Sequence, residues 1–178
     1  MKFTETILKG AFIITPDLME DERGFFARAF CRNEFEEQGL NPNLVQSNIS
    51  FNEMKGTMRG MHYQAGPHAE VKLVRCTAGA IYDVIVDLRL ESPTFRQWFS
   101  TELTEKNHQS LYVPEGFAHG YQTLTPQTEV FYQVSAFYHR ASERGIRWDD
   151  PTFGIEWPLP VTVVSKKDAS HPKWEAER

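Results

Sequence analysis

Short runs of apolar and alternating residues recur along most of the chain. The runs are rich in β-branched and aromatic residues, which favour strands. Gly, Pro or Asn separates most of them, and these residues are typical of turns. The predicted strands lie within residues 11–16, 24–30, 71–79, 80–89, 97–104, 109–114, 120–126 and 129–138. The pattern therefore predicts a protein built mainly of short β-strands.

Residues 71–79, VKLVRCTAG, show the strand period most clearly. Val71 and Leu73 fall on one face of this strand, whereas Lys72 and Val74 fall on the other. A lysine on such a strand points to water if the sheet has one apolar face, or lines a cavity if both faces are covered. The sequence leaves both arrangements open.

Residues 31–40 carry the signals of one short helix near the N-terminus. Asn33 is predicted as the N-cap, Glu36 as the third helical residue and Gly39 as the terminator. Many short strands with a single short helix predict an all-β protein, a β-sandwich or jelly roll of the cupin type with a ligand cavity between its sheets. The composition barely changes along the chain, so residues 1–178 are expected to form a single domain.

Composition and charge narrow the class of protein. The 178 residues carry a formal net charge of −5, and nucleic-acid binding needs a basic footprint instead. No segment approaches the roughly 20 apolar residues of a membrane span, and the N-terminus is too polar for a secretory signal. Two cysteines without a C-x-x-C spacing suit a reduced protein without a disulfide. We expect a cytoplasmic protein that binds neither nucleic acid nor membrane.

Residues 58–64, MRGMHYQ, place His62 close to Arg59 and Gly60. A lone histidine in such a window is a structural core residue, a metal ligand or a catalytic base. Burying a cation without an anionic partner is costly, so the basic residues on strands either face water or line a cavity that holds an anion. The residues that could line such a cavity together with His62 lie on or beside predicted strands. They are Arg59, Lys72, Arg75, His119 and Tyr132.

Most catalytic chemistries lack a signal in this chain. A metal site could draw only on His62, His68, Glu70 and His119, without the His-x-His pair of metal-binding cupins. The G-x-S-x-G, G-x-G-x-x-G and P-loop patterns are all absent. Acid–base chemistry remains, since His, Asp, Tyr and Lys together suit proton abstraction next to a carbonyl group. We therefore expect no metal and no cofactor.

Seven ordered blocks at near-constant spacing give the chain a close family resemblance. They are DERGFFARAF, QSNISFNEMKGTMRGMHYQ, VKLVRCTAGAIYDVIVDLR, SPTFRQWFSTELT, LYVPEGFAHGY, FYQVSAFYHRASERGIRWDDP and the pair IEWP and SKKD. On these blocks, residues 12–168 resemble the dTDP-4-dehydrorhamnose 3,5-epimerase family. The resemblance implies a cupin jelly-roll homodimer and an isomerase that uses no metal or redox cofactor.

The resemblance also implies the reaction and the residues that carry it. The substrate would be dTDP-4-dehydro-6-deoxy-D-glucose, inverted at C3 and C5 to give dTDP-4-dehydro-L-rhamnose. His62 would be the base, Asp168 its charged partner, Lys72 the group that stabilises the C4 enolate oxygen, and Tyr132 the proton donor on the opposite face. Gly60 is expected to let the backbone pass close to the ligand.

A second set of residues is expected to bind the nucleotide and the sugar. Tyr138 would stack on the pyrimidine, and the segment carrying Arg23 would cross to the other subunit. Arg28 and Ser47 lie in nucleotide-contacting segments but depart from the family, which often has a carboxylate at both positions. The predicted binding residues are Arg23, Arg28, Gln46, Ser47, Asn48, Arg59, His119, Tyr138, Glu143 and Lys167.

Three alternative functions remain open at this point. A 3- or 5-monoepimerase acting on a dTDP-, CDP- or GDP-linked 4-keto sugar would use the same acid–base residues. A sugar-binding jelly roll without catalysis would need no proton donor opposite a base. A metal-dependent cupin oxygenase is disfavoured by the missing His-x-His pair.

Overall fold

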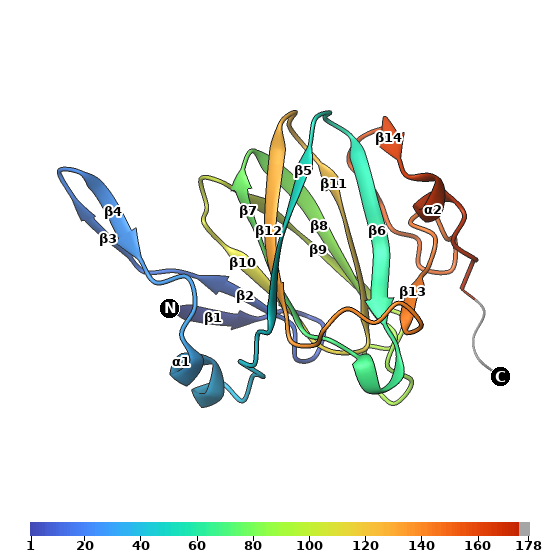
Figure 1. Ribbon diagram of the computed structural model, residues 1–178, viewed down its shortest axis with the longest axis horizontal. Coiled ribbons are helices and arrows are strands. Elements are labelled where there is room, and N and C mark those ends of the chain that lie inside the picture. Colours follow the sequence, from blue (N-terminus) through green and yellow to red (C-terminus); the bar gives the residue numbers. More distant parts are fainter. Residues whose placement is uncertain (175–178) are drawn as a thin grey trace.

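A computed structural model describes residues 1–174 as two stacked β-sheets with a hairpin standing apart from them (Figure 1). This architecture confirms the predicted all-β sandwich. The strands are β1 Lys2–Glu5, β2 Phe12–Thr15, β3 Leu18–Asp21, β4 Gly24–Ala27, β5 Gln46–Asn52, β6 Thr57–Gln64, β7 Lys72–Ala78, β8 Ala80–Asp87, β9 Trp98–Thr104, β10 Ser110–Val113, β11 Phe117–Thr123, β12 Thr128–Val134, β13 Glu143–Gly145 and β14 Val163–Val164. The helices are α1 Arg32–Glu37, the 3-10 turn η1 Gly66–His68 and α2 Lys166–Ala169.

Each of the two sheets pairs strands that are distant in sequence. The first sheet has the order β1-β2-β10-β7-β12-β5, and the second has the order β13-β6-β11-β8-β9. Pairing is antiparallel within both orders, and β14 adds a short parallel pairing to β6. Consecutive strands such as β7 and β8 therefore belong to opposite sheets, as expected of a jelly roll.

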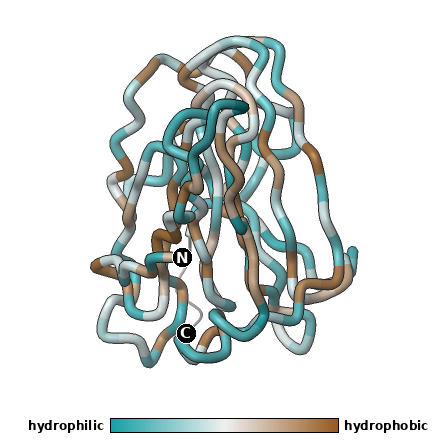
Figure 2. Tube along the Cα trace, turned by 90° about the vertical axis from the view of Figure 1, so that its left-hand side faces the viewer, coloured by the Kyte–Doolittle hydropathy of each residue, from teal (hydrophilic) through white to brown (hydrophobic). Residues whose placement is uncertain are grey.

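The main hydrophobic core lies between the sheets. It contains Val74 of β7, Ile85 of β8, Leu111 of β10 and Tyr121 of β11, all at most 4% exposed. Hydropathy changes repeatedly along the tube in Figure 2, as the pleat sends successive residues to opposite faces. The inner face of each sheet thus supplies residues to the core and to the wall of any cavity between the sheets.

The outer face of the first sheet is also partly covered at β7. This decides whether the sheet has one covered face or two, the question that the sequence left open for Lys72. Leu73 packs outward against Phe35 of α1 and Tyr112 of β10, while Val74 points into the core. Lys72 is only 8% exposed. The alternation predicted for this strand is confirmed, and the sheet has two covered faces here.

The N-terminal helix is present but starts earlier than predicted. Cys31 is the N-cap and provides no side-chain cap, so the prediction of Asn33 as N-cap is wrong. Asn33 instead lies inside the first turn. Gly39 follows the helix with φ at +70° and donates to Glu36 O at 2.9 Å, as a terminating glycine should.

The β3–β4 hairpin projects away from the sandwich (Figure 1). Four large apolar residues on it are exposed: Leu18 at 42%, Met19 at 57%, Phe25 at 49% and Phe26 at 66%. Exposed apolar surface of this kind marks an interaction site.

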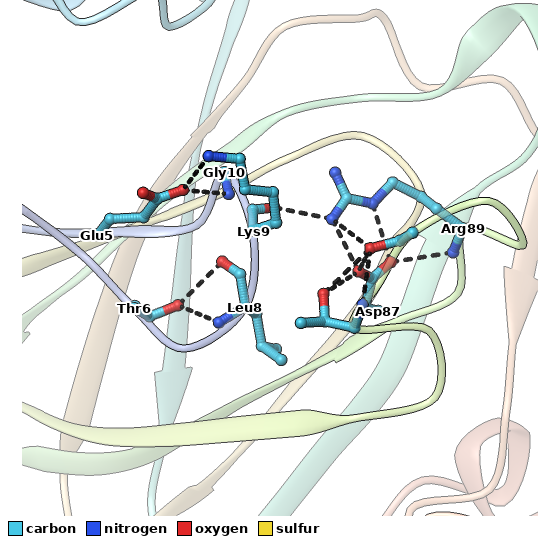
Figure 3. Close-up of polar contacts among 9 residues, drawn as sticks. Glu5, Thr6, Leu8, Lys9, Gly10, Asp87 and Arg89 are labelled. Atoms are coloured by element: carbon cyan, nitrogen blue, oxygen red, sulfur yellow. Dashed lines mark hydrogen bonds and ion pairs between the residues drawn. The ribbon is translucent and has the colours of Figure 1, made fainter.

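A polar network fixes the end of β8 against the N-terminal loop (Figure 3). The buried Asp87 carboxylate accepts hydrogen bonds from Arg89, Ser92 and Thr94, and Arg89 also donates to Lys9 O at 2.7 Å. Burial alone would raise the pKa of Asp87, but these donors outweigh it and hold the pKa below its ordinary value. The network ties the start of the chain to the second sheet.

Two further observations bear on the class of protein. Cys31 and Cys76 are both free thiols, as predicted. No helix within residues 1–174 is long and apolar enough to cross a membrane.

Candidate active site

A cavity of about 320 Å³ opens between the two sheets. β5, β7 and β12 of the first sheet form one wall, and β6 and β11 of the second sheet form the other. Its volume is at the lower end of the range of small-molecule sites. The lining residues are Gln46, Asn48, Ser50, Arg59, His62, Tyr63, Gln64, Glu70, Lys72, His119, Gly120, Tyr121, Tyr132, Val134, Tyr138 and Glu143.

His62 lies on β6 and pairs with Asp168 from the far end of the chain. Its Nε2 is 2.8 Å from Asp168 Oδ1, so Nδ1 is the ring nitrogen left for a ligand. The His62 side chain is 37% exposed and that of Asp168 is 6% exposed. One partner therefore faces the cavity and the other lies behind it.

Helix capping determines where Asp168 sits. Ser165 is the N-cap of α2, and its hydroxyl oxygen accepts a hydrogen bond from the Asp168 N–H at 3.0 Å. The Asp168 Oδ2 atom accepts the Gly60 N–H at 3.1 Å. The Ser-x-x-Asp spacing of residues 165–168 is the signal of a capping box, and it could have predicted this helix from the sequence.

Asp168 is held as a carboxylate. Burial would raise its pKa, but the hydrogen bond and charge of His62, together with the donors at Gly60 and Ser165, keep the pKa below its ordinary value. A buried anion beside an imidazole fixes the tautomer of the ring and stabilises its protonated form. His62 and Asp168 thus have the geometry of a general base and its orienting partner.

Lys72 enters the cavity from β7 and pairs with Glu70. The two side chains are 9% and 10% exposed, and the ammonium group donates to Glu70 Oε1. Their opposite charges compensate each other inside the protein. Lys72 can present a positive charge to a ligand oxygen, as predicted for an enolate-stabilising group.

Tyr132 faces the same cavity from β12, in the sheet opposite to His62. Burial raises the pKa of its phenol, and the negative charge of Glu70 raises it further. The phenol is therefore protonated at neutral pH and can donate a proton. A base on one wall and an acid on the other form an arrangement that can move protons across a bound molecule.

A chain of contacts holds Tyr138 beside the cavity. The Tyr138 N–H donates to Gln46 Oε1 at 2.6 Å, and its hydroxyl donates to Glu143 Oε2 at 3.0 Å. Lys167 donates to the other oxygen of Glu143. The Tyr138 ring is 59% exposed, which leaves it accessible to a flat ligand.

Arg59 and His119 occupy the second sheet beside His62. Arg59 Nε donates to Asn52 Oδ1 at 2.7 Å, which holds the guanidinium near the cavity wall. His119 Nε2 lies 2.7 Å from Oδ1 of the buried Asp83, whose pKa is raised by burial. His119 is also the direct cross-strand neighbour of His62.

Several predicted site residues are not brought into this cavity. Ser47 points to the outer face of β5, where its hydroxyl accepts from Gln133 Nε2 at 3.3 Å, because neighbouring strand residues face opposite sides. Arg23 lies at the tip of the β3–β4 hairpin, paired with Asp21. Arg28 follows the hairpin and lies 3.6 Å from Glu34. Asn48, by contrast, lines the cavity as predicted.

Gly60 lies against the backbone of the neighbouring strand β11. A Cβ at this position would lie 2.5 Å from Gly120 Cα and 2.9 Å from His119 O. This is a close approach between β6 and β11, and the φ of +122° at Gly60 also suits glycine. The approach of this backbone to a ligand stays a prediction.

Gln64 is a polar residue of the site that was not selected from the sequence. Its buried side-chain NH₂ group lies within 3.3 Å of His68 O, Glu70 Oε2 and Phe137 O, and its carbonyl oxygen accepts the His139 N–H at 2.6 Å. It joins the strand of His62 to the pair formed by Glu70 and Lys72 and to the loop of Tyr138. Only its position two residues after His62 could have suggested it.

Three of the four metal ligands considered from the sequence are engaged elsewhere. His68 contacts Ser142, His119 contacts Asp83, and Glu70 pairs with Lys72. The donor atoms that do gather belong to His62, Asp168 and His171, which lie within 4.8 Å of one another. His171 was not selected from the sequence.

Comparisons with known proteins agree with this geometry. The sequence profile of the family described as dTDP-4-dehydrorhamnose 3,5-epimerase matches residues 5–176. The dTDP-4-dehydrorhamnose 3,5-epimerase of Sinorhizobium fredii is 44% identical over 97% of this chain and 89% of its own length.

Solved structures agree as well. The epimerase of the same name from Elizabethkingia anophelis has a TM-score of 0.95 and 41% identity, over 98% of this chain and 96% of its own. That from Bacillus anthracis, solved with TDP and PPi bound, has a TM-score of 0.94 and 42% identity, over 97% and 99%. The chain therefore belongs to the dTDP-4-dehydrorhamnose 3,5-epimerase family.

Proposed function

We propose that this chain is an isomerase that inverts C3 and C5 of dTDP-4-dehydro-6-deoxy-D-glucose to give dTDP-4-dehydro-L-rhamnose. The observation that carries the proposal is one cavity with the pair of His62 and Asp168 on one wall and Lys72 and Tyr132 on the other. The C4 ketone acidifies the hydrogens on the adjacent carbons. The reaction then needs only a base, an enolate-stabilising group and an acid.

His62 is the proposed base. Nδ1 takes the proton from the carbon next to the ketone, while Nε2 keeps its hydrogen bond to Asp168. The carbanion delocalises onto O4, and Asp168 stabilises the imidazolium that forms. A depressed pKa at Asp168 supports this role, because the carboxylate stays charged while His62 gains its proton.

Lys72 is the proposed enolate-stabilising group. Its ammonium is mostly withdrawn from water, where a charge interaction is stronger than at the surface. Negative charge on O4 would compete with Glu70 for the ammonium. The interaction between Lys72 and O4 would therefore strengthen as the enolate forms. An interaction that is stronger in the transition state than in the bound substrate accelerates the reaction.

Tyr132 is the proposed proton donor. Its phenol would protonate the same carbon from the opposite face and so invert it. The phenolate would then regain a proton from solvent, and the imidazolium of His62 would release its proton to solvent. Its raised pKa supports this assignment. Inversion at both carbons by one base requires the sugar ring to flip or shift between the two steps.

The remaining lining residues are proposed to hold the nucleotide. Arg59 would bind the diphosphate together with His119, and Tyr138 would stack on the pyrimidine beside Gln46 and Asn48. The related enzyme from Bacillus anthracis was solved with TDP and PPi bound. Glu143 and Lys167 would fix the position of Tyr138 through the contacts at its hydroxyl.

A homodimer with N-terminal strand exchange is part of the proposal. The β3–β4 hairpin carries Arg23 away from its own cavity and exposes Met19 and Phe26. A second copy would cover these residues and receive Arg23 into its site, with Arg28 and Ser47 near the contact.

Light scattering would test the dimer. Mixed dimers of Arg23→Ala and His62→Ala chains should regain activity at one site in two.

The proposal takes residues 1–178 as one domain, since both sheets contribute to the single proposed site. It also takes the cytoplasm as the location, where the free thiols of Cys31 and Cys76 would stay reduced.

The deciding experiment is incubation with dTDP-4-dehydro-6-deoxy-D-glucose in D₂O, with mass spectrometry of the hexose. Two deuterons gained per sugar are expected. One deuteron would show a 3- or 5-monoepimerase, and none with nucleotide binding retained would exclude an enzyme for this substrate. CDP- and GDP-linked 4-keto sugars serve as the comparison for nucleobase choice.

His62→Ala should abolish exchange and leave dTDP binding within a few-fold; surviving exchange would mean that the base is assigned wrongly.

A further inference from the structure

A second imidazole reaches the Asp168 carboxylate. His171 follows α2, and its Nε2 lies 3.7 Å from Asp168 Oδ1, the same oxygen that His62 Nε2 contacts at 2.8 Å. His171 Nε2 is buried and has no hydrogen-bond partner within the described part of the chain. A buried imidazole nitrogen without a partner needs an explanation, and one explanation is that this nitrogen binds a metal ion.

The fold holds this ring in a fixed place. A Cβ at Gly145 of β13 would lie 2.3 Å from both Cε1 and Nε2 of His171, so the strand leaves a notch that the imidazole fills. The His171 side chain is 12% exposed. The Arg147 N–H donates to Pro172 O at 3.3 Å, which fixes the backbone next to the ring.

The three side chains form the donor set of a transition-metal site. Two imidazoles and one carboxylate suit Zn²⁺ and similar divalent ions. Donors around tetrahedral Zn²⁺ are separated by about 3.3 Å, given zinc–nitrogen bonds of about 2.0 Å. The observed separations of 2.8 and 3.7 Å lie on either side of this value, so small side-chain shifts would complete the site.

The surroundings also support a metal ion. Asp168 Oδ2 accepts the Gly60 N–H, an outer contact of the kind that orients metal ligands. Two cationic side chains on adjoining segments, Lys167 and Arg147, are paired with Glu143 and Asp149 and so do not occupy the Asp168 carboxylate.

We propose that His62, Asp168 and His171 bind a divalent transition-metal ion of the Zn²⁺ class, and that this ion inhibits the isomerase. On binding, His62 Nε2 gives its hydrogen to solvent while Nδ1 takes one up, so the ring stays neutral and the ion takes the place of the hydrogen between Nε2 and Asp168. The ion then neutralises Asp168, which can no longer stabilise a protonated His62. The inhibition rests on the proposed function, whereas the binding site does not.

Binding is tested on the whole, EDTA-treated and desalted protein by calorimetric titration with ZnCl₂ and by Co²⁺ absorption. The wild type is expected to bind one ion per chain, with the visible bands of tetrahedral Co²⁺. His171→Gln, which keeps much of the side-chain volume, should bind at least about tenfold more weakly. Gly145→Ala should weaken binding as well, since the ring must move. His108→Asn is the matched control, because it removes an imidazole from the β9–β10 turn, where φ is +53°.

The outcomes separate the two parts of the proposal. Equal Zn²⁺ binding by wild type and His171→Gln, with both melting cooperatively, would overturn the site. Binding without inhibition of deuterium exchange would overturn the regulatory role alone. His171→Gln should keep its exchange activity and lose its sensitivity to Zn²⁺. If the wild type shows no exchange at all, the proposed reaction fails while the titration still decides the metal site.

Discussion

Glu70 holds the ammonium group of Lys72 inside the cavity, in an ion pair whose side chains are 10% and 9% exposed. The same carboxylate helps to raise the pKa of the Tyr132 phenol, after the larger effect of burial. Glu70 is thus a single charge that acts on both the proposed enolate-stabilising group and the proposed proton donor.

Removal of that charge should change the titration of Tyr132. In Glu70→Gln the pKa of Tyr132 is expected to fall, because the neutral amide no longer repels the phenolate. Tyrosine labelled with ¹³C at Cζ gives this pKa by NMR, with Tyr132→Phe to assign the signal. Glu37→Gln, on the exposed side of α1, is the matched control. An unchanged pKa in Glu70→Gln would show that burial alone sets the titration.

The pairing of Asp168 with His62 predicts a specific loss of rate. Asp168→Asn keeps the shape of the side chain and an acceptor for Gly60, but removes the charge that stabilises a protonated His62. Turnover should fall by about 10²- to 10⁴-fold, the usual contribution of acid–base catalysis. Binding of dTDP should stay within a few-fold by calorimetry. Asp149→Asn makes the same change beside Arg147 and should leave turnover intact; equal losses in both variants would contradict the assignment.

Tyr132→Phe should separate proton removal from inversion. The variant keeps the pair of His62 and Asp168, so washout of deuterium from a C3- or C5-labelled substrate is expected to continue. Net inversion should fall much further, since the opposite face has lost its donor. Parallel assays of washout and product, with Tyr82→Phe as the control, measure both quantities. Equal losses in washout and inversion would count against a donor role.

The Asp87 network predicts how stability depends on pH. Its pKa is lower in the folded protein than in the unfolded chain, so it stabilises the fold fully above about pH 4, the unfolded value. That contribution is lost as the pH falls through the folded pKa. Asp87→Asn should reduce the free energy of unfolding at pH 7 by about 3 kcal/mol, since it breaks a buried charged pair.

Urea unfolding at pH 7, 5 and 3.5 measures this effect. The difference between wild type and Asp87→Asn should shrink at the lowest pH, which lies below the unfolded pKa of about 4, because the unfolded wild-type chain binds a proton at Asp87 there. Glu91→Gln, an exposed change on the same loop, should unfold like the wild type at each pH. A difference that stays constant with pH would show that the carboxylate charge contributes nothing.

The fold class could be read from the sequence, but two of the strands that matter most could not. β5 and β6 do not show apolar runs, because their inner faces carry Asn48 and His62 into a cavity instead of a core. On β5 the apolar members, Ile49 and Phe51, are the exposed ones, at 67% and 49%. The hydrophobic pattern of a strand reports burial in a core, and a cavity-lining strand breaks that relation.

The residue types of the site were predictable only in part. His62, Lys72 and Tyr132 were found through motifs and do line one cavity. The pairing of His62 with Asp168 was expected only through the family resemblance, because the contact spans 106 positions and no local pattern of residues indicates it. The inner or outer face of Ser47 also depended on strand boundaries that no pattern marked.

The contact between Gly60 and Gly120 has a consequence for how such a protein can evolve. Each glycine occupies space that a side chain on the other would need, since a Cβ at Gly120 would lie 2.7 Å from Arg59 O and 3.1 Å from Gly60 Cα. Neither position can therefore gain a side chain first and wait for the other to compensate. Substitution is therefore blocked in both orders where the strand of His62 pairs with the strand of His119, so the register of these two histidines is inherited as a unit.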